Sequence, residues 1–146
     1  MEHLIEPARF LARAATLLRP GGHCFILVPN LESLAIRLCG PKYRYVMPDH
    51  LNYFSAGTLV ALAKHAPHLE VLATRAMHFN PVVIWRDMRG GTGRVPDAER
   101  ARLLKRTTAL KQKPWMRPVK WLYGVAENAL AKRGRADNLV MVLRKK

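Results

Sequence analysis

The sequence predicts an α/β fold, in which helices alternate with the strands of one sheet. Three observations lead to this class. A stretch with helical periodicity ends in a Pro-Gly-Gly turn and is followed at once by an uninterrupted apolar run. A second helical stretch precedes a second run suited to a strand, and a third such run lies near the end of the chain. Helical and strand patterns that alternate in this way are typical of a sheet covered by helices.

The composition is that of a folded protein with an unusual charge. Its 146 residues are enough to bury a core, and 49% of them are hydrophobic, which excludes a chain that is disordered throughout. Residues 1–74 hold seven basic and five acidic side chains, whereas residues 75–146 hold eighteen and five. The formal net charge of +15 therefore lies mainly in the second half, where it favours an anionic partner.

The sequence contains neither a membrane-spanning stretch nor a pattern of paired cysteines. The longest apolar run, residues 24–28, is too short to cross a bilayer, and the first residues do not form an export signal. We therefore expect a soluble, cytoplasmic protein. Cys24 and Cys39 lack the spacing of a zinc site or a disulfide framework, so both are interpreted as small buried residues.

The first helix is expected to begin at Pro7, because proline is tolerated at the first helical position. Apolar residues then recur on one helical face until the Arg-Pro-Gly-Gly turn of residues 19–22. Residues 23–28 are apolar without alternation, which predicts a strand covered on both faces within a parallel sheet. Pro29 and Asn30 end this strand at its carboxyl end, where open α/β sheets bind ligands.

The middle of the chain predicts a short helix, a loop, a second helix and a strand. A helical run at residues 31–38 leads into an aromatic and basic loop at residues 42–54. Ser55 is expected to cap a helix that Pro67 ends. Residues 69–76 then predict the second strand.

A long basic segment, residues 80–136, is interpreted as a partly helical insertion before a third strand at residues 138–144. Within it, residues 89–94 predict a glycine-rich loop, and residues 97–113 and 118–132 predict two helices. The residues expected to face inward from the second of these helices are Val119, Leu122, Tyr123, Ala126 and Leu130.

The order of these motifs resembles the second half of a class I S-adenosylmethionine-dependent methyltransferase. The resemblance is carried by residues 3–22, which end in Pro-Gly-Gly, and by residues 26–30, Ile-Leu-Val-Pro-Asn. Residues 48–55, Pro-Asp-His-Leu-Asn-Tyr-Phe-Ser, are similar to the ubiquinone-biosynthesis O-methyltransferase branch of that family. The likeness covers residues 1–79 and the final strand.

The resemblance implies that the chain forms the C-terminal half of a Rossmann-like methyltransferase sheet. Three mixed strands with helices are expected, and the last strand should lie between the other two and antiparallel to them. Residues 1–146 would then form one partial domain, with residues 80–136 as a lid-like insertion. The cofactor loop of the family has no counterpart here, because the glycine cluster at residues 90–93 follows no clear strand. We therefore expect a truncated domain that by itself binds S-adenosylmethionine weakly or not at all.

His50 is the candidate catalytic base. It stands beside Asp49 in a loop expected at the ligand end of the sheet, and an imidazole exchanges protons near neutral pH. The resemblance places His3 beside the cofactor, so His3 is the candidate cofactor-binding residue. The candidate substrate-binding residues are Asn30, Tyr53 and Phe54.

Each candidate also has a structural interpretation. His50 could bond only to the backbone of its loop, and His3 could be solvated. An asparagine such as Asn30 after a proline is often an ordinary turn residue, and Tyr53 and Phe54 could anchor the loop to the core. No metal is expected, because the remaining histidines lack metal-ligand spacing; they are His23, His65, His68 and His78.

Two classes of function follow from these observations. The first is a methyltransferase that uses S-adenosylmethionine and acts on a small-molecule, lipid-linked or glycan-linked acceptor. The alternative is a non-enzymatic basic module that binds an anionic partner or membrane surface through residues 86–120. Nucleic acid is not expected, because the chain shows no helix-turn-helix, zinc-finger or RNA-binding signature.

Two interaction surfaces are expected. The edge of the strand at residues 24–28 should be exposed and available to an N-terminal half or to a second copy of the chain. Residues 97–133 are expected to form two helices that bind anionic liposomes or a phosphorylated acceptor, more weakly as salt rises. The cations expected to carry this binding are Lys105, Arg106, Lys111 and Lys113.

Overall fold

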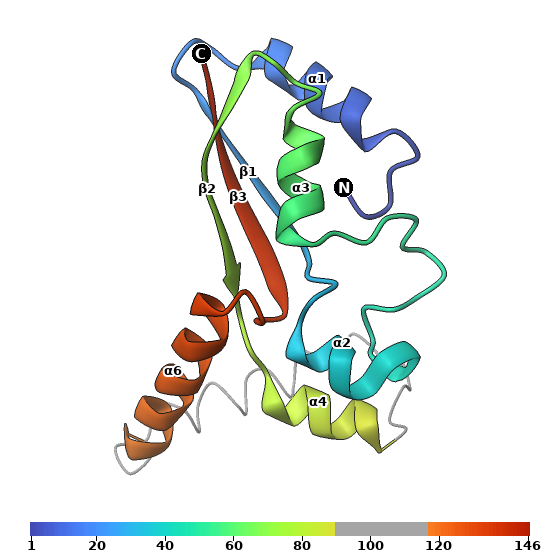
Figure 1. Ribbon diagram of the computed structural model, residues 1–146, viewed down its shortest axis with the longest axis vertical. Helices are drawn as coiled ribbons and strands as arrows, with labels where there is room; N and C mark the ends of the chain where they lie inside the picture. The colour runs from blue at the N-terminus through green and yellow to red at the C-terminus, as the bar shows by residue number, and fades with distance from the viewer. Residues whose placement is uncertain (90–116) are drawn as a thin grey trace, which may run out of the picture.

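The computed structural model describes residues 1–89 and 117–146. In chain order its elements are α1 (Pro7–Leu17), β1 (His23–Pro29), α2 (Leu34–Cys39), η1 (Gly40–Lys42), α3 (Ala56–Ala63), β2 (Leu69–Met77), α4 (Pro81–Met88), α6 (Arg117–Lys132) and β3 (Asn138–Lys145). Figure 1 shows α1 and α3 beside one face of the sheet, with α2, α4 and α6 grouped toward its lower end. These elements fit the predicted α/β class. None of the described helices has the length and apolar character needed to span a membrane.

The three strands are ordered β1-β3-β2, with β3 in the middle. β3 is antiparallel to both neighbours, so that Met141 lies opposite Ile26 on one side and Thr74 on the other. The predicted place and direction of the last strand are therefore confirmed. The expected mixture of parallel and antiparallel strands is wrong for this sheet, because β1 and β2 each pair with β3 and both ladders are antiparallel.

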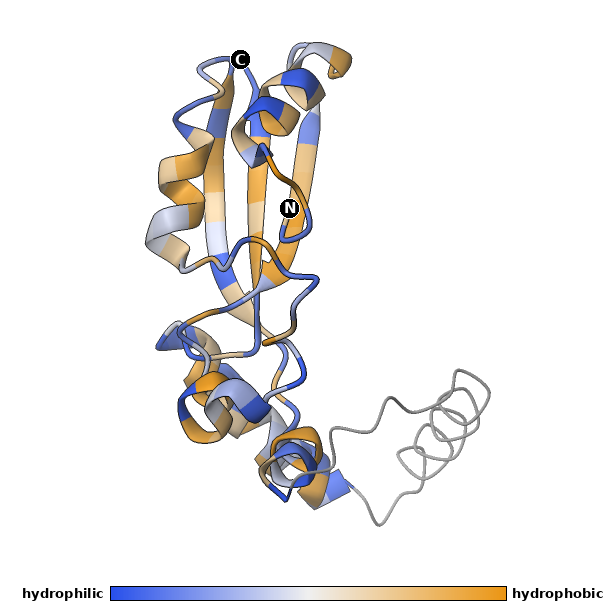
Figure 2. Ribbon diagram, turned by 90° about the vertical axis from the view of Figure 1, so that its right-hand side faces the viewer, coloured by the Kyte–Doolittle hydropathy of each residue, from blue (hydrophilic) through white to orange (hydrophobic). Residues whose placement is uncertain are grey.

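β1 has one covered face and one exposed face. Ile26 and Val28 are buried, whereas Phe25 and Leu27, which alternate with them, are 69% and 56% exposed. In Figure 2 the strands are coloured mainly as hydrophobic along their length. The predicted strand buried on both faces is thus wrong for the described residues, because their helices pack against a single face of the sheet.

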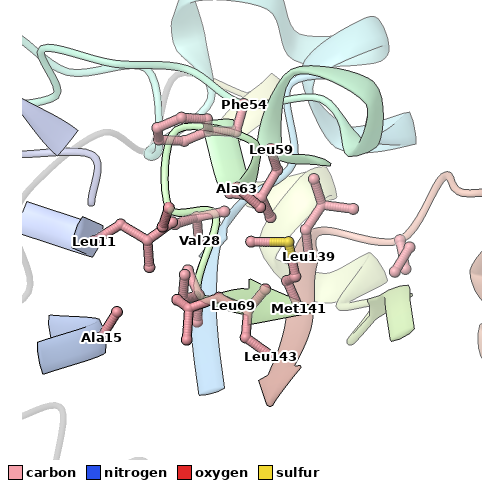
Figure 3. Packing of buried hydrophobic residues seen from close by; sticks show 14 residues of the cluster. Leu11, Ala15, Val28, Phe54, Leu59, Ala63, Leu69, Leu139, Met141 and Leu143 are labelled. Carbon is pink, nitrogen blue, oxygen red and sulfur yellow. The ribbon is translucent and has the colours of Figure 1, made fainter. Parts of the chain in front are cut away.

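The core fills the space between that face and helices α1 and α3 (Figure 3). Leu11 of α1, Leu59 of α3 and Met141 at the centre of β3 are all fully buried in it. Burying side chains of this size stabilises the fold by about 2 kcal/mol each. Leu11 and Ala15 of the predicted apolar face of the first helix therefore pack on the sheet, whereas Phe10, expected on the same face, is exposed.

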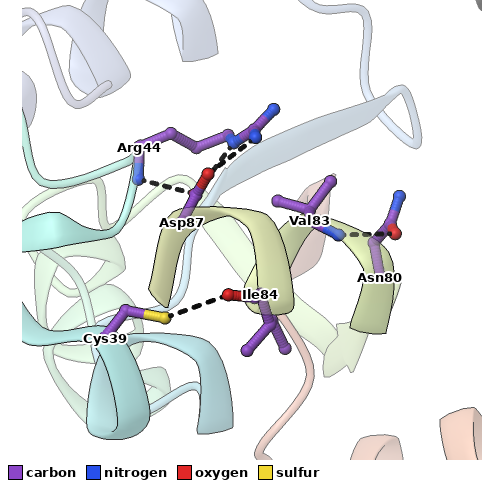
Figure 4. Close-up of polar contacts among 6 residues, drawn as sticks. All are labelled: Cys39, Arg44, Asn80, Val83, Ile84 and Asp87. Carbon is purple, nitrogen blue, oxygen red and sulfur yellow. Dashed lines mark hydrogen bonds and ion pairs between the residues drawn. The ribbon is translucent and has the colours of Figure 1, made fainter. Parts of the chain in front are cut away.

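A second cluster lies between α2 and α4, beyond the carboxyl end of β1. Its buried members are Ala35, Cys39, Tyr43 and Ile84. Figure 4 shows the Cys39 thiol directed at the main-chain oxygen of Ile84, at 3.6 Å. α4 begins after Asn80, whose side chain accepts a hydrogen bond from the Val83 N–H at 3.2 Å. α4 was not predicted from the sequence, although an asparagine cap followed by Pro81 is a recognisable helix start.

α6 confirms the second helix predicted in the insertion, but only part of its predicted packing. None of its residues is buried, and Val119 and Leu122, which were expected to face inward, are both exposed. Near the end of the helix, Leu130 packs against the core, and the Tyr123 hydroxyl donates to the main-chain oxygen of Phe79. The glycine cluster at residues 90–93 and the helix predicted over residues 97–113 lie outside the described residues.

Candidate functional site

A pocket of about 390 Å³ lies at the carboxyl end of β1. It is formed by the first residues of the chain, the end of β1, the aromatic loop and the first residue of β3. The residues that line it are Glu2, His3, Leu27, Val28, Pro29, Tyr45, Met47, Asp49, His50 and Asn138. Two of the predicted site residues, His3 and His50, therefore lie in one pocket.

The two histidines are in direct contact, although they are distant in the sequence. Their ring centroids are 4.7 Å apart and their planes are inclined by 71°. His50 also makes an edge contact with the ring of Tyr53, at 6.1 Å between centroids. The structure thus brings together the candidate base and the candidate cofactor-binding residue.

Both imidazoles are oriented by main-chain carbonyl groups. The Nδ1 atom of His50 lies 2.8 Å from the main-chain oxygen of Tyr45, and Nδ1 of His3 lies 2.8 Å from that of Asp49. Because a carbonyl oxygen can only accept, each Nδ1 carries the hydrogen and each neutral ring leaves Nε2 unprotonated. Nε2 is therefore the atom of each ring that can accept a proton or bind a ligand.

Glu2 adds a carboxylate to this pair. Its Oε1 lies 3.8 Å from Nε2 of His3, and its Oε2 lies 3.1 Å from the terminal amino group of Met1. Partial burial opposes ionisation of Glu2, but a backbone hydrogen bond and the nearby positive charges outweigh it and lower the pKa of the carboxyl. The Glu2 carboxyl is therefore ionised at neutral pH and forms an ion pair with the terminal amino group.

Glu2, His3 and His50 could together hold a metal ion. One ligand atom from each residue lies within 4.8 Å of the others. Two imidazoles and a carboxylate form a donor set suited to zinc and related transition ions, and ligating histidines commonly bond through their other nitrogen, as both do here. No metal was expected from the spacing of the histidines in the sequence. This donor set is not visible in the sequence, because its residues come from two segments that only the fold brings together.

Tyr53 lies beside the pocket, whereas Phe54 lies in the core. The Tyr53 hydroxyl donates to the main-chain oxygen of Met47 at 3.1 Å, so it stabilises the loop that carries His50. Phe54 is buried in the cluster under the sheet. The expected substrate contact of Phe54 is contradicted by this burial, and its structural interpretation as a loop anchor holds.

Asn30 is fully buried and its polar atoms are engaged within the protein. Its Nδ2 donates to the main-chain oxygens of Gly134 at 2.8 Å and Ala136 at 2.7 Å. Its Oδ1 accepts a hydrogen bond from the Glu32 N–H at 3.1 Å. The expected role in substrate binding is therefore contradicted, because both amide hydrogens serve to tie the end of β1 to the loop before β3.

Sequence reasoning missed Glu2, Tyr45 and Met47 as pocket residues. Glu2 directly precedes His3, so its proximity to a candidate residue was a usable signal. Which residues of the aromatic loop face the pocket depends on its turns, where the Val46 N–H donates to the Tyr43 oxygen and the His50 N–H donates to the Met47 oxygen. Such turns have no periodicity that a sequence pattern could show.

Comparison with known proteins points to one family. Residues 1–68 match the model of a family described as a methyltransferase domain. The chain is similar to the ubiquinone biosynthesis O-methyltransferase of Cupriavidus pinatubonensis, with 28% identity over 89 residues, covering 56% of this chain and 35% of the relative. It is also similar to the enzyme of the same name from Caulobacter vibrioides, with 32% identity over 77 residues, covering 42% of this chain and 31% of the relative. The matched part is thus about a third of the length of these curated relatives. No solved structure shows a significant match.

Proposed function

We propose that the chain is part of a class I methyltransferase, the family that its match over residues 1–68 supports, and that it takes part in transferring a methyl group from S-adenosylmethionine to an acceptor oxygen. The observation that carries the proposal is the contact between His3 and His50 in one pocket at the carboxyl end of β1. The names of the two relatives support oxygen as the atom that is methylated.

We assign the role of general base to His50. When bound, S-adenosylmethionine supplies a methyl group on a positively charged sulfur. A hydroxyl acceptor must be held in line with that methyl group and must lose its proton as the new oxygen–carbon bond forms, while the sulfur–carbon bond breaks and the neutral thioether leaves. Nε2 of His50 accepts this proton, while Nδ1–H stays bonded to the Tyr45 carbonyl and keeps the ring in place.

The residues around His50 fit a cationic cofactor. The Glu2 carboxylate favours the positive charge of the sulfonium and also favours the imidazolium that His50 becomes. His3 is assigned to the cofactor, because its Nε2 can accept a hydrogen bond from a cofactor amino or hydroxyl group. The pocket wall formed by Leu27, Tyr45 and Met47 supports an acceptor with an apolar or aromatic part, whether it is a free small molecule or linked to a lipid or glycan.

A further part of the proposal concerns the free edge of β1. Among the described residues, β1 pairs only with β3, and it has no charged residue or bulge that would discourage another strand. The opposite edge strand, β2, is interrupted by an irregularity between Val71 and Ala73. These features support pairing of β1 with the N-terminal half of a methyltransferase domain or with a second copy of the chain.

Transfer of a labelled methyl group tests the proposal. The chain, combined with the N-terminal half of a methyltransferase domain, is incubated with labelled S-adenosylmethionine and with phenolic, lipid-linked and glycan-linked acceptors. His50→Ala is expected to lower the turnover rate by about 10²–10⁴-fold, which is the usual contribution of a general base. His65→Ala, at an exposed histidine outside the pocket, should leave the rate unchanged. Equal rates for wild type and His50→Ala would remove His50 from the mechanism, and absence of labelled product would contradict transfer by this chain.

The exposed side of α6 favours a second candidate function, binding to an anionic membrane surface. Trp121 and Leu122 are 71% and 63% exposed, and Arg117 and Lys120 lie within one turn of them. Aromatic and aliphatic side chains next to cations are typical of helices that lie in the membrane interface. The four cations expected to carry such binding, from Lys105 to Lys113, lie outside the described residues.

Vesicles of phosphatidylglycerol and of phosphatidylcholine test this second function. Binding to the anionic vesicles is expected to weaken with salt and to fall when Trp121→Ala and Lys120→Glu are combined. Trp85→Ala, at an exposed tryptophan of α4, serves as the control and should bind like wild type. Salt-independent binding, or no binding to either vesicle, would contradict the membrane function.

A further inference from the structure

We infer that Asn52 is a positioning residue that holds His3 against His50. Four hydrogen bonds join residues 1–4 to the loop that carries His50, and Asn52 makes three of them. Asn52 does not line the pocket, so its effect on the site is exerted through the two histidines. The chemical importance of this pairing rests on the proposed function, whereas the pairing itself can be tested without any enzymatic activity.

The three bonds made by Asn52 reach main-chain oxygens on both sides of His3. Its main-chain N–H donates to the oxygen of Glu2 at 3.0 Å, directly before His3. Its side-chain Nδ2 donates to the oxygen of Leu4 at 2.6 Å, directly after His3, and to that of Met1 at 3.4 Å. Asn52 itself follows His50 by two residues. The loop is thus attached to the backbone on both sides of His3.

An asparagine is suited to this position because its amide nitrogen has two hydrogens. One side chain can therefore donate to two carbonyl oxygens at once. An aspartate of the same shape has no hydrogen to donate when ionised, and its charge would repel the two carbonyl oxygens. The attachment of the loop to residues 1–4 therefore depends on the hydrogen-bond donors of the Asn52 side chain as well as on its volume.

The two histidines depend on Asn52 to different degrees. His50 is half-buried, and its ring is held by the Tyr45 oxygen and by the ring of Tyr53, both of which belong to its own loop. The His3 side chain is 56% exposed, and its hydrogen bond is made to the main-chain oxygen of Asp49 in that loop. The main-chain bond from Asn52 to Glu2 does not depend on the side chain, so a substitution at Asn52 removes only the two bonds made by Nδ2. Loss of these two bonds should release His3 while His50 keeps its orientation.

Nuclear magnetic resonance of the whole chain with isotope-labelled histidine tests the inference. In wild type, ring protons of His3 and His50 should show a mutual Overhauser effect, and both Nδ1 atoms should carry a hydrogen. In Asn52→Ala the Overhauser effect and the Nδ1–H signal of His3 are expected to disappear, while the Nδ1–H signal of His50 remains. Signals of His23, His65, His68 and His78 should stay in place and report that the fold is intact.

Two further variants separate positioning from simple packing. Asn52→Asp keeps the shape of the side chain but removes its hydrogens, so it should lose the contact as Asn52→Ala does. Asn80→Ala removes the asparagine cap of α4 and should keep the contact. Retention of the His3–His50 contact in Asn52→Asp would overturn the inference, as would equal loss of that contact in Asn80→Ala.

A measurement on wild type covers the case in which the Asn52 variants do not fold. The two Nδ2 hydrogens of Asn52 should exchange slowly with solvent and show Overhauser effects to Leu4, because both are bonded to carbonyl oxygens. Rapid exchange without contact to Leu4 would overturn the inference. A chain that transfers no methyl group but shows the contact would contradict the proposed function and leave the positioning role of Asn52 supported.

Discussion

The guanidinium of Arg44 binds both carboxylate oxygens of the buried Asp87, with Nε 3.0 Å from Oδ2 and Nη2 2.8 Å from Oδ1 (Figure 4). The main-chain N–H of Arg44 adds a third bond to Oδ2 at 3.2 Å. Burial opposes ionisation of Asp87, but the bonds from Arg44 outweigh it and hold the pKa of that carboxyl below its ordinary value. The pair attaches α4 to the loop that also carries His50.

Replacing the arginine of this pair should destabilise the protein strongly. Arg44→Met is expected to lower the free energy of unfolding by about 2–4 kcal/mol at pH 7, because it leaves the buried Asp87 carboxylate without its cation. Lys42→Met, at an exposed position nearby, is the control and should change it by less than about 0.5 kcal/mol. Urea denaturation measures both values. If Arg44→Met lowers the free energy of unfolding no more than Lys42→Met does, the stabilising role of the Arg44–Asp87 pair is contradicted.

The same pair predicts how stability depends on pH. Because the pKa of Asp87 is lowered in the folded state, its contribution is complete above the ordinary carboxyl pKa of 3.8 and is lost as pH falls through the folded value. The free energies of unfolding of wild type and Arg44→Met should therefore converge below pH 3.8. A difference that stays constant between pH 7 and pH 3 would contradict ionisation of Asp87 as its source.

Asp137 predicts the opposite dependence on pH. It is buried, its Oδ2 accepts the Asn80 N–H at 3.2 Å, and its Oδ1 has no hydrogen-bond partner among the described residues. Burial raises the pKa of this carboxyl, so its stabilising contribution is complete below pH 3.8 and is lost as pH rises through the folded value. Asp137→Asn should therefore raise the free energy of unfolding at pH 7 by on the order of 1 kcal/mol. Thermal unfolding of wild type and Asp137→Asn at pH 7 and pH 3.5 measures the difference in stability. A gain in stability that is equal at both pH values would contradict ionisation of Asp137 as its source.

Asn30 should be required for stability rather than for ligand binding. Asn30→Ala is expected to cost about 3 kcal/mol, because two buried carbonyl oxygens lose their donors and a small cavity remains. Asn30→Asp keeps the acceptor for the Glu32 N–H but removes both donors, so it should also destabilise. Urea denaturation measures the two variants. Normal stability in both would contradict the structural role of Asn30.

The exposed edge of β1 predicts self-association of the isolated chain. Wild type should form dimers or larger species, because pairing with another strand would give hydrogen-bond partners to the free main-chain N–H and C=O groups of β1. It would also cover Phe25 and Leu27. Leu27→Lys is expected to shift the chain toward monomer, whereas Leu72→Lys, at an exposed leucine of β2, should have a smaller effect. Sedimentation velocity over a range of concentrations measures this. A monomeric wild type at high concentration would contradict pairing with a second copy.

The helix ends show what local sequence can determine. Ser55 was predicted to cap α3, and its hydroxyl accepts the Thr58 N–H at 3.2 Å while Thr58 bonds back to the Ser55 N–H at 2.8 Å. The short helix before the aromatic loop begins a few residues later than predicted, after Ser33, whose hydroxyl accepts the Ile36 N–H at 3.1 Å. Such caps are contacts between residues three apart, so the sequence contains all of their partners.

The sequence by itself determined where most helices and strands of the described residues lie, because helix periodicity, caps and apolar runs depend on neighbours within a few positions. Tertiary structure alone decided that β1 has an exposed face, that the Asn30 amide donates its hydrogens to distant main-chain oxygens, and that the His3 ring contacts the His50 ring. Each of these depends on contacts between segments far apart in the chain, whose geometry is set by the packing of α1 and α3 on the sheet and by the bonds of Asn52. A hydrogen-bonding side chain has the same local pattern whether it contacts substrate or backbone, and only its partners in space distinguish the two roles.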